Sequence, residues 1–160
     1  MAKENSRYTG LQLSILVISR VLIGWYFLYE GISKVLNPNW SSYAFLQDSK
    51  GIFAPLFQSI ASNAAVLSVV DFLNVWGLTA IGLGLILGLF TRIAIICGIA
   101  ITALFSLSHP SLIGVEYMLP ATDNAMWIGK NIIFIALLLI LYLFPTSTTI
   151  GIDRFFFRNK

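Results

Sequence analysis

Four long apolar segments, separated by polar stretches, dominate the pattern of this 160-residue chain. A membrane-spanning helix needs about 20 predominantly apolar residues, and long apolar runs with few charges are typical of such helices. A proline follows three of the four segments, and proline ends a helix. The pattern therefore predicts an all-α fold, a four-helix transmembrane bundle, with spans at about Leu11 to Leu36, Val66 to Phe90, Ile93 to Ser108 and Met126 to Phe144.

The stretch between the first two spans, residues 39–65, mixes aromatic and aliphatic side chains with serines, Asp48, Lys50 and Gln58. No part of it is apolar enough to cross a membrane. Aromatic residues beside polar ones concentrate at the headgroup layer. We expect one or two short amphipathic helices here, which lie on the membrane or cap the bundle. Since the spans and their loops use the chain, residues 1–160 are expected to form a single membrane domain.

The composition excludes an ordinary soluble domain, because 58% of the residues are hydrophobic and only 11% are charged, against about 25% charged in soluble domains. The net charge of +3 does not indicate nucleic acid, since the basic residues lie at the predicted membrane boundaries. The single cysteine, Cys97, and the single histidine, His109, exclude an internal disulfide, a thiolate metal site and a bis-histidine haem within one chain. No metal site is expected, and Cys97 is expected to be a buried structural thiol.

The basic residues also predict the orientation, because cytoplasmic loops carry the excess of lysine and arginine. Four spans place both termini on one side of the membrane. That side holds the larger group of basic residues, Lys3, Arg7, Arg92, Arg154, Arg158 and Lys160, and the other side holds Lys34, Lys50 and Lys130. We therefore expect an integral plasma (inner) membrane protein with both termini cytoplasmic and with its two long loops facing outward.

Polar side chains occur near the outer end of every predicted span. A charge near the bilayer centre costs about 3 kcal/mol on insertion scales, so such residues are normally turned inward and paired. All four helices should therefore bring polar groups to one level, just inside the outer boundary. The residues expected there are Glu30, Lys34, Asp71, Asn74, His109, Lys130 and Asn131.

Helical spacing predicts some of the partners. Glu30 and Lys34 are four residues apart and can pair. Asp71 is expected to pair with Lys34, Lys130 or Arg20, because a lone carboxylate at that depth would neutralise instead. The inward face of the first span is expected to carry Arg20, Gly24, Phe27, Gly31 and Lys34.

Several of these residues also have a purely structural explanation. Arg20 can be an anchor that bonds neighbouring helix ends. Lys34 and Lys130 can extend to the headgroups, as lysines near helix ends do. His109 precedes a proline and can be a helix-end residue. These alternatives stay open at the level of the sequence.

Small residues form a stripe along the second span, where Ala80, Gly84 and Gly88 recur at every fourth position. Such a stripe lets another helix approach closely. We expect contact with a neighbouring helix of the same bundle, and a homo-oligomer contact is the alternative. Near the C-terminus, Asp153 is expected to cap a short terminal helix or to pair with Arg154.

Such an outer polar cluster suits an amphiphilic ligand. A quinone head needs donors for its carbonyls and a proton donor or acceptor nearby, and Trp76 can supply a flat wall. A small oxyanion would also suit the cations Arg20, Lys34 and Lys130.

The first and second spans resemble the DoxX/DoxD family. Arg20, followed by the run from Gly24 to Lys34, resembles the family's first-helix signature of an arginine, a glycine with an aromatic residue, and then a glycine and a lysine. The run from Gly82 to Arg92 is similar to the family's second helix and turn. Further similar segments are Asn37-Pro38-Asn39-Trp40, which is similar to the DoxD branch, Val70 to Leu78, Asn131, and Gly151-Ile152-Asp153.

This resemblance implies a four-helix membrane fold with a quinone-linked sulfur activity. DoxD is the membrane subunit of an archaeal thiosulfate:quinone oxidoreductase, and its partner subunit is DoxA. The first hypothesis is therefore a membrane subunit that uses quinone and a DoxA-like or other redox partner. In it, Glu30 and Asp71 are the candidate catalytic residues, and one or the other relays protons. The residues that bind quinone or the anion are Arg20, Lys34, Asn74, Trp76, His109, Lys130 and Asn131.

The second hypothesis is a non-catalytic membrane scaffold, or a lipid- or small-molecule-binding module, that supports a partner redox protein. The lack of residues to ligate a redox cofactor and the small-residue stripe favour it. Membrane lipids surround the protein in both hypotheses. A transporter is less favoured, because four spans would need oligomerisation to form a path.

Overall fold

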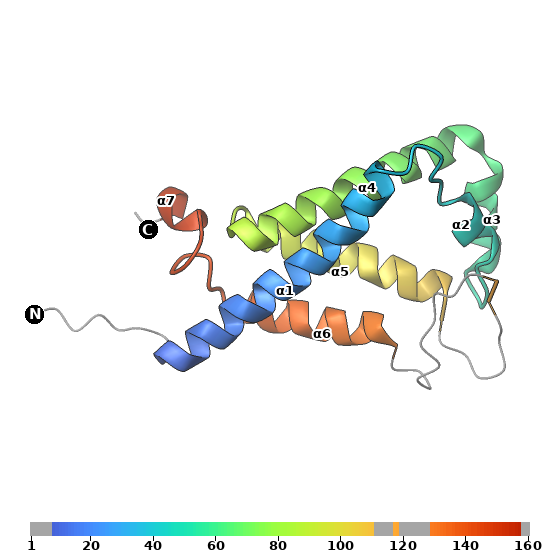
Figure 1. Ribbon diagram of the computed structural model, residues 1–160. Helices are drawn as coiled ribbons and strands as arrows, with labels where there is room; N and C mark the ends of the chain where they lie inside the picture. Colours follow the sequence, from blue (N-terminus) through green and yellow to red (C-terminus); the bar gives the residue numbers. More distant parts are fainter. Residues whose placement is uncertain (1–7, 111–116, 119–128, 158–160) are drawn as a thin grey trace, which may run out of the picture.

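The computed structural model describes residues 8–110, 117–118 and 129–157, and these residues form helices and connecting turns without strands. Three helices are long and apolar enough to cross a membrane, namely α1 (Gly10–Val35), α4 (Ala64–Leu87) and α5 (Thr91–Ser108) (Figure 1). A shorter apolar helix, α6 (Lys130–Leu143), packs against α5. The prediction of an all-helical membrane protein is confirmed.

The observed helices begin and end near the predicted bounds, and local capping explains the differences. The Asn63 side chain accepts hydrogen bonds from the backbone N–H groups of Ala65 and Val66, so α4 begins before the predicted start. Gly88 ends α4 in the left-handed conformation, with φ of 65°. The first residues of the predicted fourth span, 126–128, lie outside the described residues.

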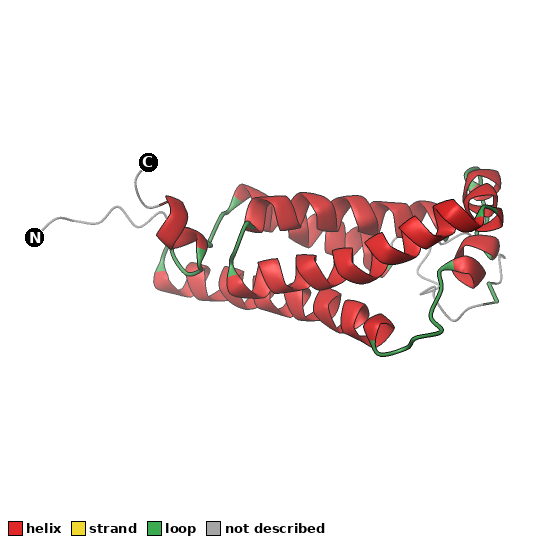
Figure 2. Cartoon of the chain, turned by 90° about the horizontal axis from the view of Figure 1, so that it is seen from above, coloured by secondary structure: helices red, strands yellow, loops and turns green. Residues whose placement is uncertain are grey.

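The long helices run alternately in opposite directions, with α1 packed mainly on α4 and α5 on α6 (Figures 1 and 2). Two short helices, α2 (Tyr43–Gln47) and α3 (Ala54–Ser62), lie at the end that we call the cap end. The opposite end, which we call the terminal end, holds the start of α1 and the short helix α7 (Asp153–Phe157). Both described chain ends therefore lie at the same end of the molecule.

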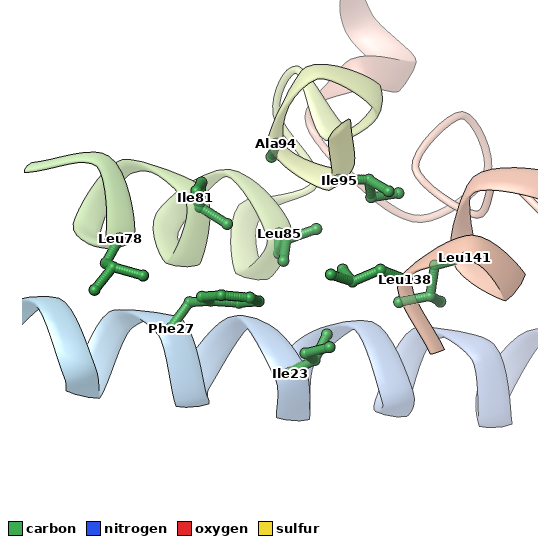
Figure 3. Close-up of a cluster of buried hydrophobic side chains, with 9 residues drawn as sticks. All are labelled: Ile23, Phe27, Leu78, Ile81, Leu85, Ala94, Ile95, Leu138 and Leu141. Atoms are coloured by element: carbon green, nitrogen blue, oxygen red, sulfur yellow. The ribbon is translucent and has the colours of Figure 1, made fainter. Parts of the chain in front are cut away.

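The main hydrophobic core lies between the four longer helices (Figure 3). Leu85 and Leu138 are fully buried in it, and Leu78 and Ile95 are 1% exposed. The complete set of buried side chains is Ile23, Phe27, Leu78, Ile81, Leu85, Ala94, Ile95, Leu138 and Leu141. A smaller cluster of Leu46, Phe57 and Ala61, which packs on Leu67 and Val70, joins α2 and α3 to the start of α4.

Glycines allow α1 and α4 to pack with their backbones in contact. A Cβ atom on Gly82 would overlap the backbone of Leu28, and one on Gly31 would overlap Thr79. Of the predicted stripe, Ala80 is exposed, whereas a Cβ atom on Gly84 would lie 3.2 Å from the Ala94 side chain of α5, so the expected contact with a neighbouring helix is found at Gly84. The close contact with α1 lies at Gly82, which is two residues from Gly84 and therefore nearly on the opposite side of α4.

Much of the outer surface of the helices is apolar, as contact with lipid hydrocarbon requires. Trp25, Phe72 and Ile93 are each more than 60% exposed. Cys97 also lies on this surface, so the expectation of a buried thiol was wrong. Cys97 lies on a different face of α5 from the buried residues Ala94, Ile95 and Gly98.

Candidate functional site

Lys34 lies at the cap end of α1 among aromatic rings. Its ammonium group is 3.3 Å from a Glu30 carboxylate oxygen, so the predicted pair one helical turn apart is confirmed. The nitrogen also lies 5.3 Å from the ring centre of Trp40 and 5.9 Å from that of Phe105. Contacts of this length with ring faces are cation–π interactions. The Lys34 side chain is only 14% exposed, whereas that of Glu30 is 39% exposed. We call these four residues the Lys34 cluster.

A second cluster surrounds His109, the residue that caps the end of α5. The ring stacks on Phe45 at 4.0 Å between centres, and Tyr117 lies 4.7 Å away. Nδ1 is 3.1 Å from the Ser108 hydroxyl. Nε2 is 3.9 Å from an Asp48 carboxylate oxygen, which is too long for a hydrogen bond. We call these five residues the His109 cluster.

The His109 cluster is buried, and burial changes its acid–base properties. Burial lowers the pKa of His109 below its ordinary value, the Asp48 carboxylate opposes this effect, and Lys50 adds to the lowering. Burial raises the pKa of Tyr117, and the charge of Asp48 raises it further. Neutral histidine and neutral tyrosine are therefore the favoured forms near pH 7.

Hydrogen bonds tie the His109 cluster to the segments around it. The Asp48 carboxylate accepts a hydrogen bond of 2.7 Å from the backbone N–H of Met118. The Tyr117 hydroxyl donates to the Pro110 carbonyl at 2.7 Å. The Lys50 ammonium lies 5.5 Å from the centre of the Tyr117 ring. The segment after α2 and the segment after α5 are therefore held together at the histidine.

The two clusters are connected through stacked aromatic side chains. The Phe45 ring, which stacks on His109, also lies 5.7 Å from the Phe105 ring of the Lys34 cluster in an edge-on arrangement. The cap end thus joins a lysine, a histidine and their acidic partners by an apolar aromatic layer. Sequence reasoning found Glu30, Lys34 and His109 but missed Asp48, Lys50 and Tyr117 as their neighbours. No spacing rule connects those residues to His109, since they lie on different segments.

Asp71 pairs with no cation in the described part of the chain, so the predicted pairing with Lys34, Lys130 or Arg20 was wrong. Its carboxylate accepts hydrogen bonds from the Ser41 hydroxyl at 2.8 Å, and from the Ser42 backbone N–H and hydroxyl at 2.8 and 2.5 Å. Ser42 is the residue directly before α2, so the carboxylate binds the backbone N–H and the hydroxyl of the residue at which that helix begins. Asp71 thereby fixes α2, which carries Phe45 and is followed by Asp48.

The remaining predicted residues at the cap end have differing surroundings. The close contacts of Gly31 with Thr79 and of Leu28 with Gly82 fix the antiparallel register of α1 and α4. This register places Lys34 near the level of Trp76, with Asn74 slightly nearer the cap. The Trp76 ring is 54% exposed. The Asn74 side-chain oxygen is buried and has no hydrogen-bond partner in the described part of the chain. At the start of α6, Lys130 is exposed and Asn131 is half-buried.

Arg20 lies at the terminal end, apart from the other predicted site residues. It is 14 positions before Lys34 on α1, a separation of about 21 Å along a helix axis. The guanidinium is buried and donates to the Thr146 hydroxyl at 3.0 Å and to the Ile150 carbonyl at 2.8 Å. Gly88, which ends α4, lies beside it. The structure therefore places Arg20 as the anchor of the segment after α6.

Asp153 completes this anchor, but not in either of the predicted ways. Its carboxylate accepts hydrogen bonds from the backbone N–H groups of Phe90 and Thr91 at 2.7 and 3.1 Å, so it caps α5. Burial alone would raise the pKa of Asp153, but hydrogen bonds from Thr91, Ser147 and Phe90 outweigh burial and lower it. The expectations of a cap on the terminal helix and of a pair with Arg154 are corrected accordingly.

Comparison with known proteins adds one finding. A model of the DoxX family matches residues 15–109, which include the long helices α4 and α5, most of α1, and the whole of the Lys34 cluster. No match was found among the curated proteins or among the solved structures.

Proposed function

The chain belongs to the DoxX family, and from that premise we propose that it is the membrane subunit of a quinone-linked oxidoreductase that handles a sulfur compound such as thiosulfate. The proposal places the quinone head or the anion at the cap end, beside the Lys34 and His109 clusters. The observation that carries it is the combination of buried cationic or titratable groups with flat aromatic walls at one place. The DoxD-like branch of the family is part of the proposal.

The side chains at the cap end fit the chemistry of a quinone head. Such a head is flat and apolar, and its two carbonyl oxygens accept hydrogen bonds. Trp40, Phe105 and Phe45 offer flat surfaces, and Lys34 is a donor held among them by Glu30. Nε2 of His109 is a buried polar atom without a hydrogen-bond partner in the described residues. Buried polar atoms are nearly always paired, so an open one favours a ligand or a water at that position.

Each residue has a stated task in this proposal. When bound, a quinone supplies the two-electron, two-proton couple of the reaction. Lys34 binds the carbonyl or the anion, and Glu30 sets the position of its ammonium group. Asp71 acts as a positioning residue through α2 rather than as a proton relay, since its carboxylate is engaged with Ser41 and Ser42. Asn74, Trp76, Lys130 and Asn131 remain proposed neighbours of the ligand.

The wider architecture forms part of the same proposal. In this proposal α6 belongs to the fourth span, and its 14 residues cover about 21 Å of a hydrocarbon core of about 30 Å. The exposed Ile52, Phe53 and Leu56 beside α2 and α3 would lie in the headgroup layer. The chain would then be one membrane domain, with both termini cytoplasmic in the plasma membrane. A DoxA-like redox protein would bind as partner, and self-association is compatible with this arrangement.

A non-catalytic scaffold is the second candidate, and the contacts of Asp71 and Arg20 favour it. Both residues bind backbone groups of distant segments and so serve the fold. In that case the protein would retain its redox partner or a lipid without binding quinone.

Quinone retention distinguishes the two candidates. The protein is purified in nanodiscs with its native lipids, and quinone is counted by mass spectrometry in the wild type, in Lys34→Gln and in Arg92→Gln. Arg92→Gln is the matched control, because Arg92 is exposed at the terminal end. We expect quinone near one per chain, unchanged in the control and reduced by about tenfold in Lys34→Gln, since one charge-assisted hydrogen bond is lost.

Two outcomes would count against the proposal. Background quinone in the wild type, with a redox protein or lipid still bound, would favour the scaffold. An equal amount of bound quinone per chain in all three proteins would show that Lys34 does not contribute to quinone binding. The sulfur branch is tested separately, as thiosulfate-dependent quinone reduction in membranes that contain the protein and its redox partner. If no thiosulfate-dependent reduction is seen, the protein would bind quinone but take its electrons from another electron donor.

A further inference from the structure

The surroundings of His109 differ from those of a histidine that only fills space. The residue is 5% exposed, and its ring stacks on Phe45 and lies 4.7 Å from the Tyr117 ring. Nδ1 faces the Ser108 hydroxyl at 3.1 Å. Nε2 faces the Asp48 carboxylate at 3.9 Å, and no hydrogen bond reaches this nitrogen from the described residues. The carboxylate is itself held by the Met118 backbone N–H.

This arrangement accommodates a proton on Nε2. A protonated imidazole buried alone would carry a large desolvation cost. Here the new charge would lie next to the carboxylate of Asp48, whose side chain is 4% exposed. Attraction between opposite charges offsets part of the cost of burial. The neutral ring is also tolerated, because the aromatic rings of Phe45 and Tyr117 pack against it.

We propose that His109 and Asp48 form a buried acid–base pair that takes up and releases a proton at the cap end, next to the ligand of the oxidoreductase. This inference rests on the proposed function, since a quinone accepts two protons when it accepts two electrons. The proton is bound at Nε2 of His109, and Asp48 balances its charge. Phe45 and Tyr117 are positioning residues that hold the ring.

Three titratable side chains face the ring in the described part of the chain. Asp48 and Lys50 come from the segment that follows α2, and Tyr117 comes from the segment that follows α5. After burial, the Asp48 charge raises the pKa of His109 and the Lys50 charge lowers it. The two charges therefore move the pKa of His109 in opposite directions. Variants that remove one charge or the other should give opposite results.

The single histidine of the chain makes the test direct. The protein is labelled with isotopic histidine and placed in nanodiscs, so that one imidazole signal reports on His109. Its chemical shift is followed by NMR from about pH 4 to about pH 9, a range that covers the usual histidine titration. The wild type is compared with Asp48→Asn and Lys50→Gln. Asparagine keeps a side-chain oxygen that can accept from Met118, so the loop contact is preserved.

The expected result is a single titration whose midpoint moves in opposite directions in the two variants. The midpoint moves to lower pH in Asp48→Asn, because the compensating negative charge is lost. It moves to higher pH in Lys50→Gln, because a repelling positive charge is lost. An imidazole that stays in one protonation state over the whole range, or equal midpoints in the three proteins, would overturn the pair. If Asp48→Asn does not fold, the direction in which the titration midpoint moves in Lys50→Gln still tests the proposed pair.

A short-chain ubiquinone added to the nanodiscs separates this inference from the proposed function. We expect it to shift the His109 signal of the wild type. A signal that titrates as expected but does not respond to ubiquinone would support the acid–base pair and contradict the quinone site. A signal that responds to ubiquinone, with the same midpoint in all three proteins, would overturn the pair and support the quinone site.

Discussion

Arg20 shows how this protein uses a buried charge inside an apolar helix. The guanidinium donates to two acceptors on the segment after α6, at 3.0 Å to Thr146 and at 2.8 Å to Ile150. We expect Arg20→Lys to keep the charge but to lose one of the two bonds, because an ammonium group on a straight stem cannot copy the planar fork. The free energy of unfolding should fall by about 2 kcal/mol. Reversible unfolding in mixed detergent micelles measures this change.

Arg92→Lys is the control for Arg20→Lys. Arg92 is exposed at the start of α5, and exposed substitutions of this kind stay within about 0.5 kcal/mol. Equal stability of both variants and the wild type would show that the Thr146 and Ile150 contacts do not hold the terminal end. A loss in Arg92→Lys as large as in Arg20→Lys would point to a general effect of arginine instead.

Sequence spacing predicts the partner of a polar residue only when both lie on one element. Glu30 and Lys34 were paired correctly, because a helix places residues four positions apart on the same face. Asp153 accepts from backbone N–H groups, and Asp71 accepts from one backbone N–H and two serine hydroxyls, all on segments distant in sequence. A backbone N–H belongs to every residue type except proline, so it leaves no signal in the sequence. His109 was found as a polar helix end, but Asp48 was missed as its neighbour because its carboxylate comes from a segment distant in sequence.

At the scale of the elements, the backbone contact of α1 with α4 depends on glycine at particular positions. A Cβ atom on Gly82 would overlap the backbone of Leu28, whereas nothing lies within 4 Å of one on Gly77. We expect Gly82→Ala to force the helices apart and to cost about 1–3 kcal/mol of unfolding free energy. Gly77→Ala, on the same helix, should be neutral or stabilising by up to about 1 kcal/mol, because alanine favours the helix.

The two alanine variants are compared by unfolding in the same micelles. Changes of opposite sign in the unfolding free energy would confirm that close packing, rather than helix propensity, determines the effect of alanine at Gly82. A Gly82→Ala protein as stable as Gly77→Ala would contradict the close approach of α1 and α4. The sequence predicted that a stripe of small residues lets α4 approach another helix, and Gly84 of that stripe does lie against Ala94 of α5, but the stripe does not include Gly82, which contacts α1. The register is fixed by how α1 packs, as the contact of Gly24 with Leu85 and Ile86 shows.

At the scale of the whole molecule, the two ends are built for different tasks. At the terminal end, the backbone N–H groups of Ile152 and Asp153 donate to the carbonyls of Leu87 and Gly88. These bonds, together with the Asp153 cap on α5, close the turn between α4 and α5. The cap end instead brings aromatic, cationic and acidic side chains together on α1, α2, α5 and the segments that follow them. The alternation of four apolar segments predicted this division into ends, whereas their side-chain contacts required the folded chain.

This division gives the orientation prediction a direct test. A cysteine is placed at the cap end as Ile52→Cys, where the residue is 93% exposed, or at the terminal end as Thr149→Cys, which is also exposed. Both changes are made in a Cys97→Ser background. If the cap end faces outward, as the excess of basic residues near the termini predicts, a membrane-impermeant maleimide added to intact cells should label Ile52→Cys alone. Thr149→Cys should become labelled only after the membrane is opened.

The native chain provides the control for this experiment. Cys97 is exposed on the apolar surface of α5, so a lipid environment should shield it from a water-soluble reagent before and after opening. Labelling of Thr149→Cys in intact cells, with Ile52→Cys protected, would reverse the orientation and place the Lys34 and His109 clusters on the cytoplasmic side. Labelling of both in intact cells would contradict the placement of the two ends on opposite sides of a membrane. The expected pattern would put the proton uptake proposed for His109 and Asp48 on the outer face.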